Sequence, residues 1–246
     1  NLVSNSRLRD LADTANPLLR ELELKAPGTF HHSLQVMNMS EAAARAIGAN
    51  PLLVKAGAMY HDIGKMTNPQ CFVENESLVS KAEDQKYHYG LSYKQSSKDI
   101  IRHVPDGVEL ARKHGLPQVI LEFIITHHGT TVTRYFYDKY VSEGGNPADR
   151  EDFTYPGVPP TTKEQVILML CDTIEAASRT LKPSSPEDYS LLVDELVQAK
   201  MDEGQFTDSE ISIKDMETVK EVIKSYLVHL YHERIAYPKD KNNIKK

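Results

Sequence analysis

The most informative chemical feature of this sequence is a histidine beside an aspartate. His61 and Asp62 follow the apolar stretch 56–60, which is typical of a helix. An imidazole nitrogen and a carboxylate oxygen directed at one point suit Zn, Fe, Mn or Co better than Ca, which prefers ligands that are all oxygen. Because a His-Asp pair is common by chance, it indicates a metal site only together with other residues.

Residues of the same kind stand in three other apolar surroundings. His32 lies in a stretch with helical spacing of apolar residues, and His127 and His128 follow the largely apolar run 119–125. Asp172 comes directly after six consecutive apolar residues. A carboxylate there costs several kcal/mol unless a cation or a hydrogen-bonded partner offsets its desolvation. We therefore expect four helices to bring metal-binding side chains together.

Simpler interpretations remain open for several residues. His103 ends a predicted helix, and a role as its C-cap is as good an interpretation as a role as ligand. His31 is better explained as a surface or supporting residue, and His229 as a packed or solvated one. Asp172 could pair with Arg179 instead of a metal, but their spacing is poor because ion pairs on a helix prefer three or four residues.

Composition narrows the class of partner. The chain has 29 Lys and Arg against 35 Asp and Glu, for a net charge of −6. This balance disfavours polymeric nucleic acid but leaves room for a small anion. Cys71 and Cys171 form no CxxC pair, which argues against a thiolate zinc site or a disulfide framework and indicates a reducing compartment. No apolar run approaches the ~20 residues needed to cross a bilayer.

Helix signals recur and strand signals are scarce, so we predict one all-α domain over 1–246. Capping residues and prolines mark several helix starts. A long loop is expected after His61-Asp62, an irregular insert at 129–160 and a disordered tail at 239–246. The expected helices are an N-terminal segment within 1–24 broken at Pro17, then 30–47, 51–61, 93–103, 105–114, 117–128, 161–181, 185–203 and 214–234.

The order His32, His61-Asp62, Asp172 resembles the HD superfamily of metal-dependent phosphohydrolases, which share an all-helical bundle. His103, His127 and His128 resemble the subset that holds two metals. The resemblance is greatest to the cytoplasmic domain of the seven-transmembrane HD (PgpH-type) cyclic di-AMP phosphodiesterases. The segments that carry it are 27–34, 61–65, 127–130, 155–157, 171–179 and 231–238.

The resemblance implies two divalent transition-metal ions, with Fe or Mn favoured and Zn, Co or Ni possible. It assigns the first ion to His32, His61, Asp62 and Asp172. Asp62 bridges to the second ion, which the resemblance assigns to His103, His127 and His128. A hydroxide between two such ions can attack a phosphodiester at neutral pH.

The substrate implied is a small anionic cyclic dinucleotide, cyclic di-AMP, which is opened to linear pApA. Lys65 is expected to neutralise phosphate charge or to protonate the leaving group, although it could be a solvated loop lysine. The candidate substrate contacts are Lys65, Gly129, Thr130, Arg134, Tyr155 and Arg179. Stacking on the bases by the aromatic residues at 135–140 is a weaker expectation than packing.

The resemblance also implies that the natural protein continues upstream into membrane helices, with this chain at the cytoplasmic face. The oligomeric state is left open. The alternatives are another HD hydrolase, acting on cyclic di-GMP, a nucleoside triphosphate or an alarmone, and a sensing module without turnover. A Gly-Tyr-Pro signature, which follows the paired histidines in cyclic di-GMP enzymes, is absent after His127-His128.

Overall fold

Helices make up the regular structure of the described residues, which are 3–76, 86–181, 183 and 185–235 of this computed structural model. One isolated β-bridge joins Val132 to Thr154. The prediction of an all-α fold is confirmed. No described helix is both long and apolar enough to cross a bilayer.

The described residues form α-helices joined by connections of very different lengths. Their bounds are α1 Asn5–Ala12, α2 Pro17–Lys25, α3 Pro27–Ala46, α4 Pro51–Tyr60, α5 Val73–Glu76, α6 Tyr93–Ile101, α7 His103–Lys113, α8 Gln118–Thr126, α9 Arg134–Ser142, α10 Lys163–Leu181, α11 Pro186–Asp202 and α12 Ile213–Ile235. Short 3-10 segments lie at η1 Ile63–Thr67, η2 Pro69–Cys71 and η4 Pro147–Phe153.

Local sequence explains most helix starts. The Asn50 side chain accepts hydrogen bonds from the two backbone N–H groups that follow Pro51, and Ser185 forms a capping box. The sequence predicts a capping box between Thr161 and Glu164, but in the structure the cap forms one residue later. The Thr162 hydroxyl accepts from the backbone N–H of Gln165, while the Glu164 carboxylate caps the Asn50 backbone N–H instead.

Three details of the predicted helix pattern differ from the structure: one helix start, and the contents of the expected loop and of the expected insert. The helix that carries His32 begins at Pro27 rather than at residue 30, because a proline suits the first helical position. The long loop after Asp62 contains η1, η2 and α5, with 77–85 outside the described residues. The insert at 129–160 contains α9 and η4, because Phe136 packs with Val132 and Phe153 in a small apolar cluster of their own.

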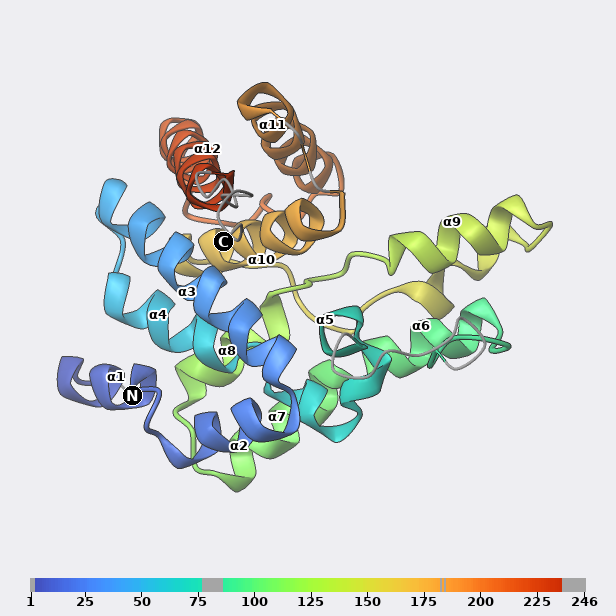
Figure 1. Cartoon of the computed structure of the whole chain (residues 1–246), viewed down its shortest axis with the longest axis horizontal. Coiled ribbons are helices and arrows are strands. Elements are labelled where there is room, and N and C mark those ends of the chain that lie inside the picture. Colours follow the sequence, from blue (N-terminus) through green and yellow to red (C-terminus); the bar gives the residue numbers. More distant parts are fainter. Residues whose placement is uncertain (1–2, 77–85, 182, 184, 236–246) are drawn as a thin grey trace, which may run out of the picture.

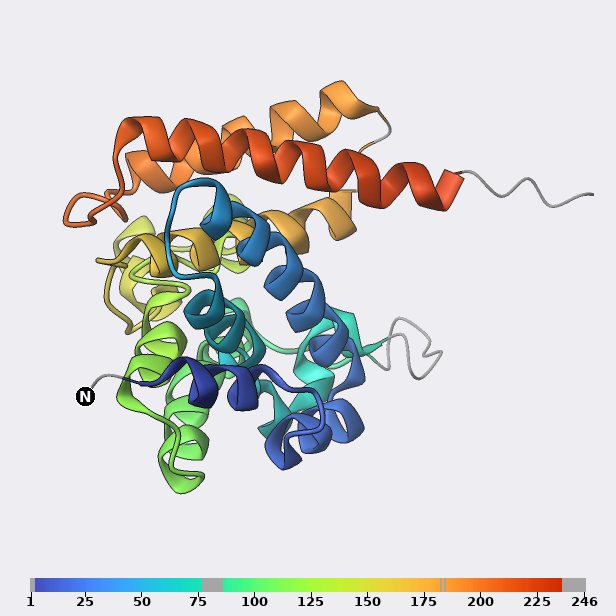
Figure 2. The ribbon, with the colours of Figure 1, turned by 90° about the vertical axis from the view of Figure 1, so that its left-hand side faces the viewer.

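The main core surrounds α10. Its apolar stretch 166–171 is fully buried, and the helix packs against α3, α4, α8 and α11. Figures 1 and 2 show α11 and α12 side by side above α10 and α3. In Figure 1, α6 and α9 extend together to the right. The core runs from Leu8 to Leu227. That 1–246 is one domain stays a prediction, and 239–246 lies outside the described residues.

Candidate metal centre

Two clusters of metal-type side chains meet where the core helices converge. In each cluster the ligand atoms lie within 4.8 Å of one another, and Asp62 belongs to both. The first cluster consists of His32, His61, Asp62 and Asp172, and the second of Asp62, His103, His127 and His128. The structure therefore brings together all the residues that the sequence proposed as metal ligands.

Several different parts of the core hold the ligand candidates. His32 comes from α3 and Asp172 from the middle of α10, whereas His61 and Asp62 lie between the end of α4 and η1. His127 and its neighbour follow α8. His103 does not end α6, as the C-cap interpretation required, but is the first residue of α7. Figure 1 shows α3, α4, α8 and α10 close together in the main body of the structure.

Backbone carbonyl groups orient three of the imidazole rings. Each of these rings donates from Nδ1 to the carbonyl three residues earlier, which leaves Nε2 facing the clusters. The pairs are His61 to Ala58 at 2.7 Å, His103 to Ile100 at 2.7 Å and His127 to Ile124 at 2.8 Å. The helix ends thus present metal-binding nitrogen atoms in fixed directions.

His32 is oriented by carboxylates instead. Its Nε2 lies 2.9 Å from Asp172 Oδ1, and its Nδ1 lies 2.5 Å from Glu175 Oε2. Sequence reasoning assigned no role to Glu175. The available signal was its position three residues after Asp172, because residues at that spacing share one face of a helix. Arg179 pairs with Glu175 at 3.5 Å, so the alternative pairing of Arg179 with Asp172 is not what the structure contains.

The clusters fit cations because several of their buried ligand atoms form no hydrogen bond. These atoms are His61 Nε2 and both carboxylate oxygens of Asp62, although Lys65 Nζ forms an ion pair with Asp62 Oδ2 at 2.7 Å. A buried polar atom that lacks a hydrogen bond costs about 1–3 kcal/mol, which a bound cation would offset. Cys71 and Cys171 are free and belong to neither cluster, so the donor set is imidazole and carboxylate, as Mn, Fe and Zn accept.

Charge differs between the two clusters. Burial disfavours the charged imidazole of His32 and His61, but the carboxylates of the first cluster outweigh it and raise the pKa of His32 to about 9 and that of His61 to about 10. In the second cluster burial prevails, lowering the pKa of His103 to about 4 and that of His128 well below its usual range. In the absence of bound cations, protons on His32 and His61 therefore balance the negative charge of the carboxylates in the first cluster.

Lys65 is largely buried, with 12% of its side chain exposed, rather than solvated. Its Nζ lies 2.7 Å from Asp62 Oδ2 and donates to Glu74 Oε1 at 2.8 Å. The ammonium also stands 4.8 Å from the centre of the Phe72 ring. Burial opposes the charge of Lys65, but the two carboxylates outweigh it and raise the pKa of this ammonium. A cation held in this way favours charge neutralisation over proton donation.

The other candidate substrate contacts have partners within the protein. Thr130 exchanges two hydrogen bonds with the Gln205 side chain, which packs against Gly129. Arg134 is exposed and pairs with Glu203 at 3.1 Å. Their role as substrate contacts stays a prediction. The ring of Tyr155 stacks on the ring of His128 with centroids 4.1 Å apart, so it supports the second cluster.

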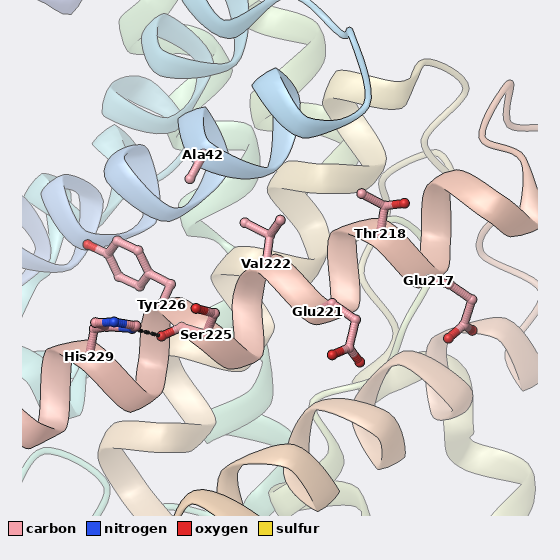
Figure 3. Close-up of a pocket in the computed structure, with 8 residues that line it drawn as sticks. All are labelled: Ala42, Glu217, Thr218, Glu221, Val222, Ser225, Tyr226 and His229. Atoms are coloured by element: carbon pink, nitrogen blue, oxygen red, sulfur yellow. Dashed lines mark hydrogen bonds between the residues drawn. The ribbon is translucent and has the colours of Figure 1, made fainter.

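Three hollows among the described residues could be considered as substrate sites, and one of about 350 Å³ lies beside His103, Asp99 and Asp106. A groove of about 730 Å³ lies between α3 and α12, where Ala42 faces Val222 and Tyr226 (Figure 3). Glu217 and Glu221 line this groove, and none of its residues belongs to the clusters. We therefore assign the substrate elsewhere.

The third hollow, about 510 Å³, adjoins the clusters and is named here the aromatic pocket. Its residues are Cys71, Phe72, Val73, Glu74, Glu76, Lys86, His88, Tyr89, Leu91, Tyr93, Ser96, Ile100, Tyr135 and Phe136. Phe72 connects it to the second cluster, because its ring meets His103 edge-on at 5.6 Å. Sequence reasoning missed this pocket, since most of its wall comes from the segment treated as a loop.

The HD domain family model matches residues 29–177, a range that includes both clusters. The chain belongs to the HD domain family. Among HD proteins, it is 36% identical to cyclic-di-AMP phosphodiesterase PgpH of Bacillus subtilis over 99% of this chain and 34% of that protein. It is 39% identical to the PgpH of Listeria monocytogenes over 98% of this chain and 33% of that protein. The chain thus spans about a third of the length of these curated relatives.

Solved HD domains confirm the architecture. The crystal structure of the L. monocytogenes phosphodiesterase PgpH HD domain is 37% identical, covers 88% of this chain and all of that one, and superposes with a TM-score of 0.80. The structure of that domain in complex with cyclic-di-AMP covers 90% of this chain and has a TM-score of 0.82. The fold expected from the HD resemblance is therefore confirmed.

Gly64 allows the close contact between η1 and α7 that positions His103. A Cβ atom on Gly64 would lie 1.9 Å from the His103 carbonyl oxygen and 2.5 Å from the Gly107 nitrogen. We expect Gly64→Ala to destabilise the protein by about 1–3 kcal/mol through overpacking and to weaken metal binding at the second cluster.

Denaturant unfolding and metal titration measure both effects. Gly107→Ala probes the same contact from α7 and should destabilise the protein less, because its Cβ would lie 3.0 Å from an Ile124 methyl group and 3.3 Å from the Gly64 backbone nitrogen. Equal stability of the Gly64→Ala variant and the wild type would contradict the close approach.

Proposed function

We propose that this HD domain hydrolyses cyclic di-AMP to a linear dinucleotide with the help of two divalent metal ions. The observation that carries the proposal is the pair of buried clusters that share Asp62. A carboxylate common to two sets of ligands suits two ions about 3.5–4 Å apart, the separation used for in-line attack on phosphorus. The PgpH relatives, named as cyclic-di-AMP phosphodiesterases, support the choice of substrate.

The residues present fit Fe or Mn as the resident ions, and Zn, Co or Ni would find the same donors. His32, His61 and Asp172 would hold one ion and His103, His127 and His128 the other, with Asp62 shared. When bound, such ions supply an activated water at neutral pH and neutralise phosphoryl oxygens. The buried atoms of Asp62 and His61 that form no hydrogen bond support this assignment.

Lys65 and Glu74 extend the site towards the substrate. The Lys65 ammonium stands beside Asp62 and is held from its other side by the buried Glu74 carboxylate. A fixed positive charge at this place lowers the energy of a phosphoryl group as its negative charge grows. We assign Lys65 this electrostatic role, and Glu74 the role of keeping its ammonium in place.

The aromatic pocket offers surfaces for the bases of a dinucleotide. Its rim exposes large apolar side chains, among them Tyr89 at 63% and Tyr135 at 65%. Nucleotide-sized pockets combine such surfaces with a few polar groups, here including His88 and Ser96. Phe136 both packs and lines the pocket, so packing and base stacking do not exclude each other in this segment.

Removal of one rim aromatic should weaken substrate binding more than catalysis. Stacking of a base on an aromatic ring contributes about 1–3 kcal/mol, so we expect Tyr135→Ala to raise KM for cyclic di-AMP about tenfold while kcat changes little. Leu191→Ala, which removes a similarly exposed side chain on α11, is the control. An unchanged KM would remove Tyr135 from the substrate site.

The activity itself is tested by incubating the purified chain, loaded with Mn²⁺ or Fe²⁺, with cyclic di-AMP, cyclic di-GMP and the mixed cyclic dinucleotide. The proposal predicts that cyclic di-AMP gives the linear dinucleotide fastest. Turnover of another substrate at a higher kcat/KM would assign a different HD hydrolase activity. Tight binding of all three without product would assign a sensing module.

A further inference from the structure

His32 is the exception among the buried histidines of the clusters whose Nδ1 forms a hydrogen bond. Its Nδ1 meets the Glu175 carboxylate at 2.5 Å, whereas the rings of His61, His103 and His127 meet backbone carbonyl groups. A backbone acceptor survives any side-chain substitution. The orientation of His32 therefore depends on the side chain of Glu175, to which the HD ligand pattern assigns no role.

One face of α10 supplies partners for both nitrogen atoms of His32. Asp172 Oδ1 lies 2.9 Å from Nε2, and Glu175, three residues later, reaches Nδ1. The spacing of three places both carboxylates on the same side of the helix. Glu175 is itself held by Arg179, whose Nη2 lies 3.5 Å from Oε2. The His32 side chain is 1% exposed and that of Glu175 12%, so water competes little for this contact.

We propose that Glu175 is a positioning residue for the first cluster. Its carboxylate accepts a hydrogen bond from the Nδ1–H group of His32, and this directs the Nε2 lone pair at the cation position beside Asp62 and Asp172. A carboxylate partner also makes an imidazole a stronger ligand than a carbonyl partner does. Glu175 thereby distinguishes the first cluster from the second, where no described ring has a carboxylate on Nδ1 within hydrogen-bond reach. The inference rests on the ligand sets proposed above.

Metal titration separates the two clusters. The wild type should bind two Mn²⁺ per chain. Loss of the partner of a ligating histidine typically weakens metal binding about 10–100-fold, so Glu175→Ala should retain one ion at its original affinity and bind the other about 10–100-fold more weakly. Glu175→Gln keeps an oxygen acceptor without the charge and should lie between. Glu195→Gln, an exposed glutamate on α11, should behave as the wild type.

A spectroscopic readout distinguishes positioning from general damage. In the zinc-loaded protein, the Nδ1 proton of His32 should resonate far downfield in the wild type and Glu195→Gln. It should move upfield or vanish by exchange in Glu175→Ala. Thermal unfolding of the metal-free variants shows whether they are folded. Because Glu175→Gln is nearly isosteric, it provides the metal and proton data if the alanine variant does not fold.

The outcomes separate the inference from the proposed function. Two ions bound with wild-type affinity by a folded Glu175→Ala, or by Glu175→Gln together with an unshifted His32 proton, would overturn the role of Glu175 and leave the ligand sets intact. A wild type that binds no ion, or that binds as many after His61→Ala, would instead reject the ligand sets themselves. Equal weakening of both ions would show that Glu175 acts on the fold rather than on His32.

Discussion

Asp62→Ala should abolish phosphodiester hydrolysis and reduce the metal content of the protein. Asp62 is the one residue common to both clusters, and it carries the charge that both sets of imidazoles face, with Oδ1 3.4 Å from His103 Nε2 and Oδ2 3.2 Å from His61 Nε2. If the loss of paired ions removes about 4 kcal/mol of transition-state stabilisation, the rate falls about 10³-fold.

The measurement combines kcat with metal content and thermal unfolding. A ligand at 100 times its Kd stabilises a folded protein by about 2.7 kcal/mol, so Mn²⁺ should raise the Tm of the wild type and not that of Asp62→Ala. Asp138→Asn, on the exposed side of α9, is the control for removal of a charge. Residual activity within tenfold of the wild type would contradict the shared role of Asp62.

The second large effect is a pH dependence confined to one cluster. In the first cluster the pKa of His32 is raised to about 9 and that of His61 to about 10 by the neighbouring carboxylates. A metal needs both imidazoles neutral, so its binding at pH 7 releases about two protons. Apparent affinity should rise about 100-fold per pH unit between pH 7 and 9 and level off above about pH 10.

The second cluster should lack this dependence. The pKa of His103 is lowered to about 4 and that of His128 falls well below its usual range, so these rings are neutral throughout the same pH interval. Calorimetric titrations in buffers of different ionisation enthalpy count the protons released by each ion. Equal proton release at both sites, or affinity that falls as pH rises from 7 to 9, would contradict the charge difference between the clusters.

The convergence of the metal-type residues could be predicted in part because several of them stood out locally. Asp172 after six apolar residues and His127 after an apolar run both required an explanation other than solvent exposure. The resemblance to HD proteins then joined residues that lie far apart along the chain. The identity of the family and the all-α fold are confirmed, while the ligand roles remain proposals.

Contacts between distant side chains were beyond local reasoning. The orientation of His32 depends on how α3 crosses α10, and no pattern within either segment fixes that crossing. The buried state of Lys65 depends on Glu74 in α5, inside a stretch where no periodic signal indicated a helix. The sequence prediction put His103 at the end of one helix, whereas it begins the next one. The sequence does not show that a single residue separates α6 from α7.

Anomalous diffraction from crystals grown with Mn²⁺ would show directly whether two cations bind on either side of Asp62. We expect two anomalous peaks about 3.5–4 Å apart, one against His32, His61 and Asp172 and the other against the three histidines at 103, 127 and 128. A single peak remote from Asp62, or none at saturating Mn²⁺, would contradict it.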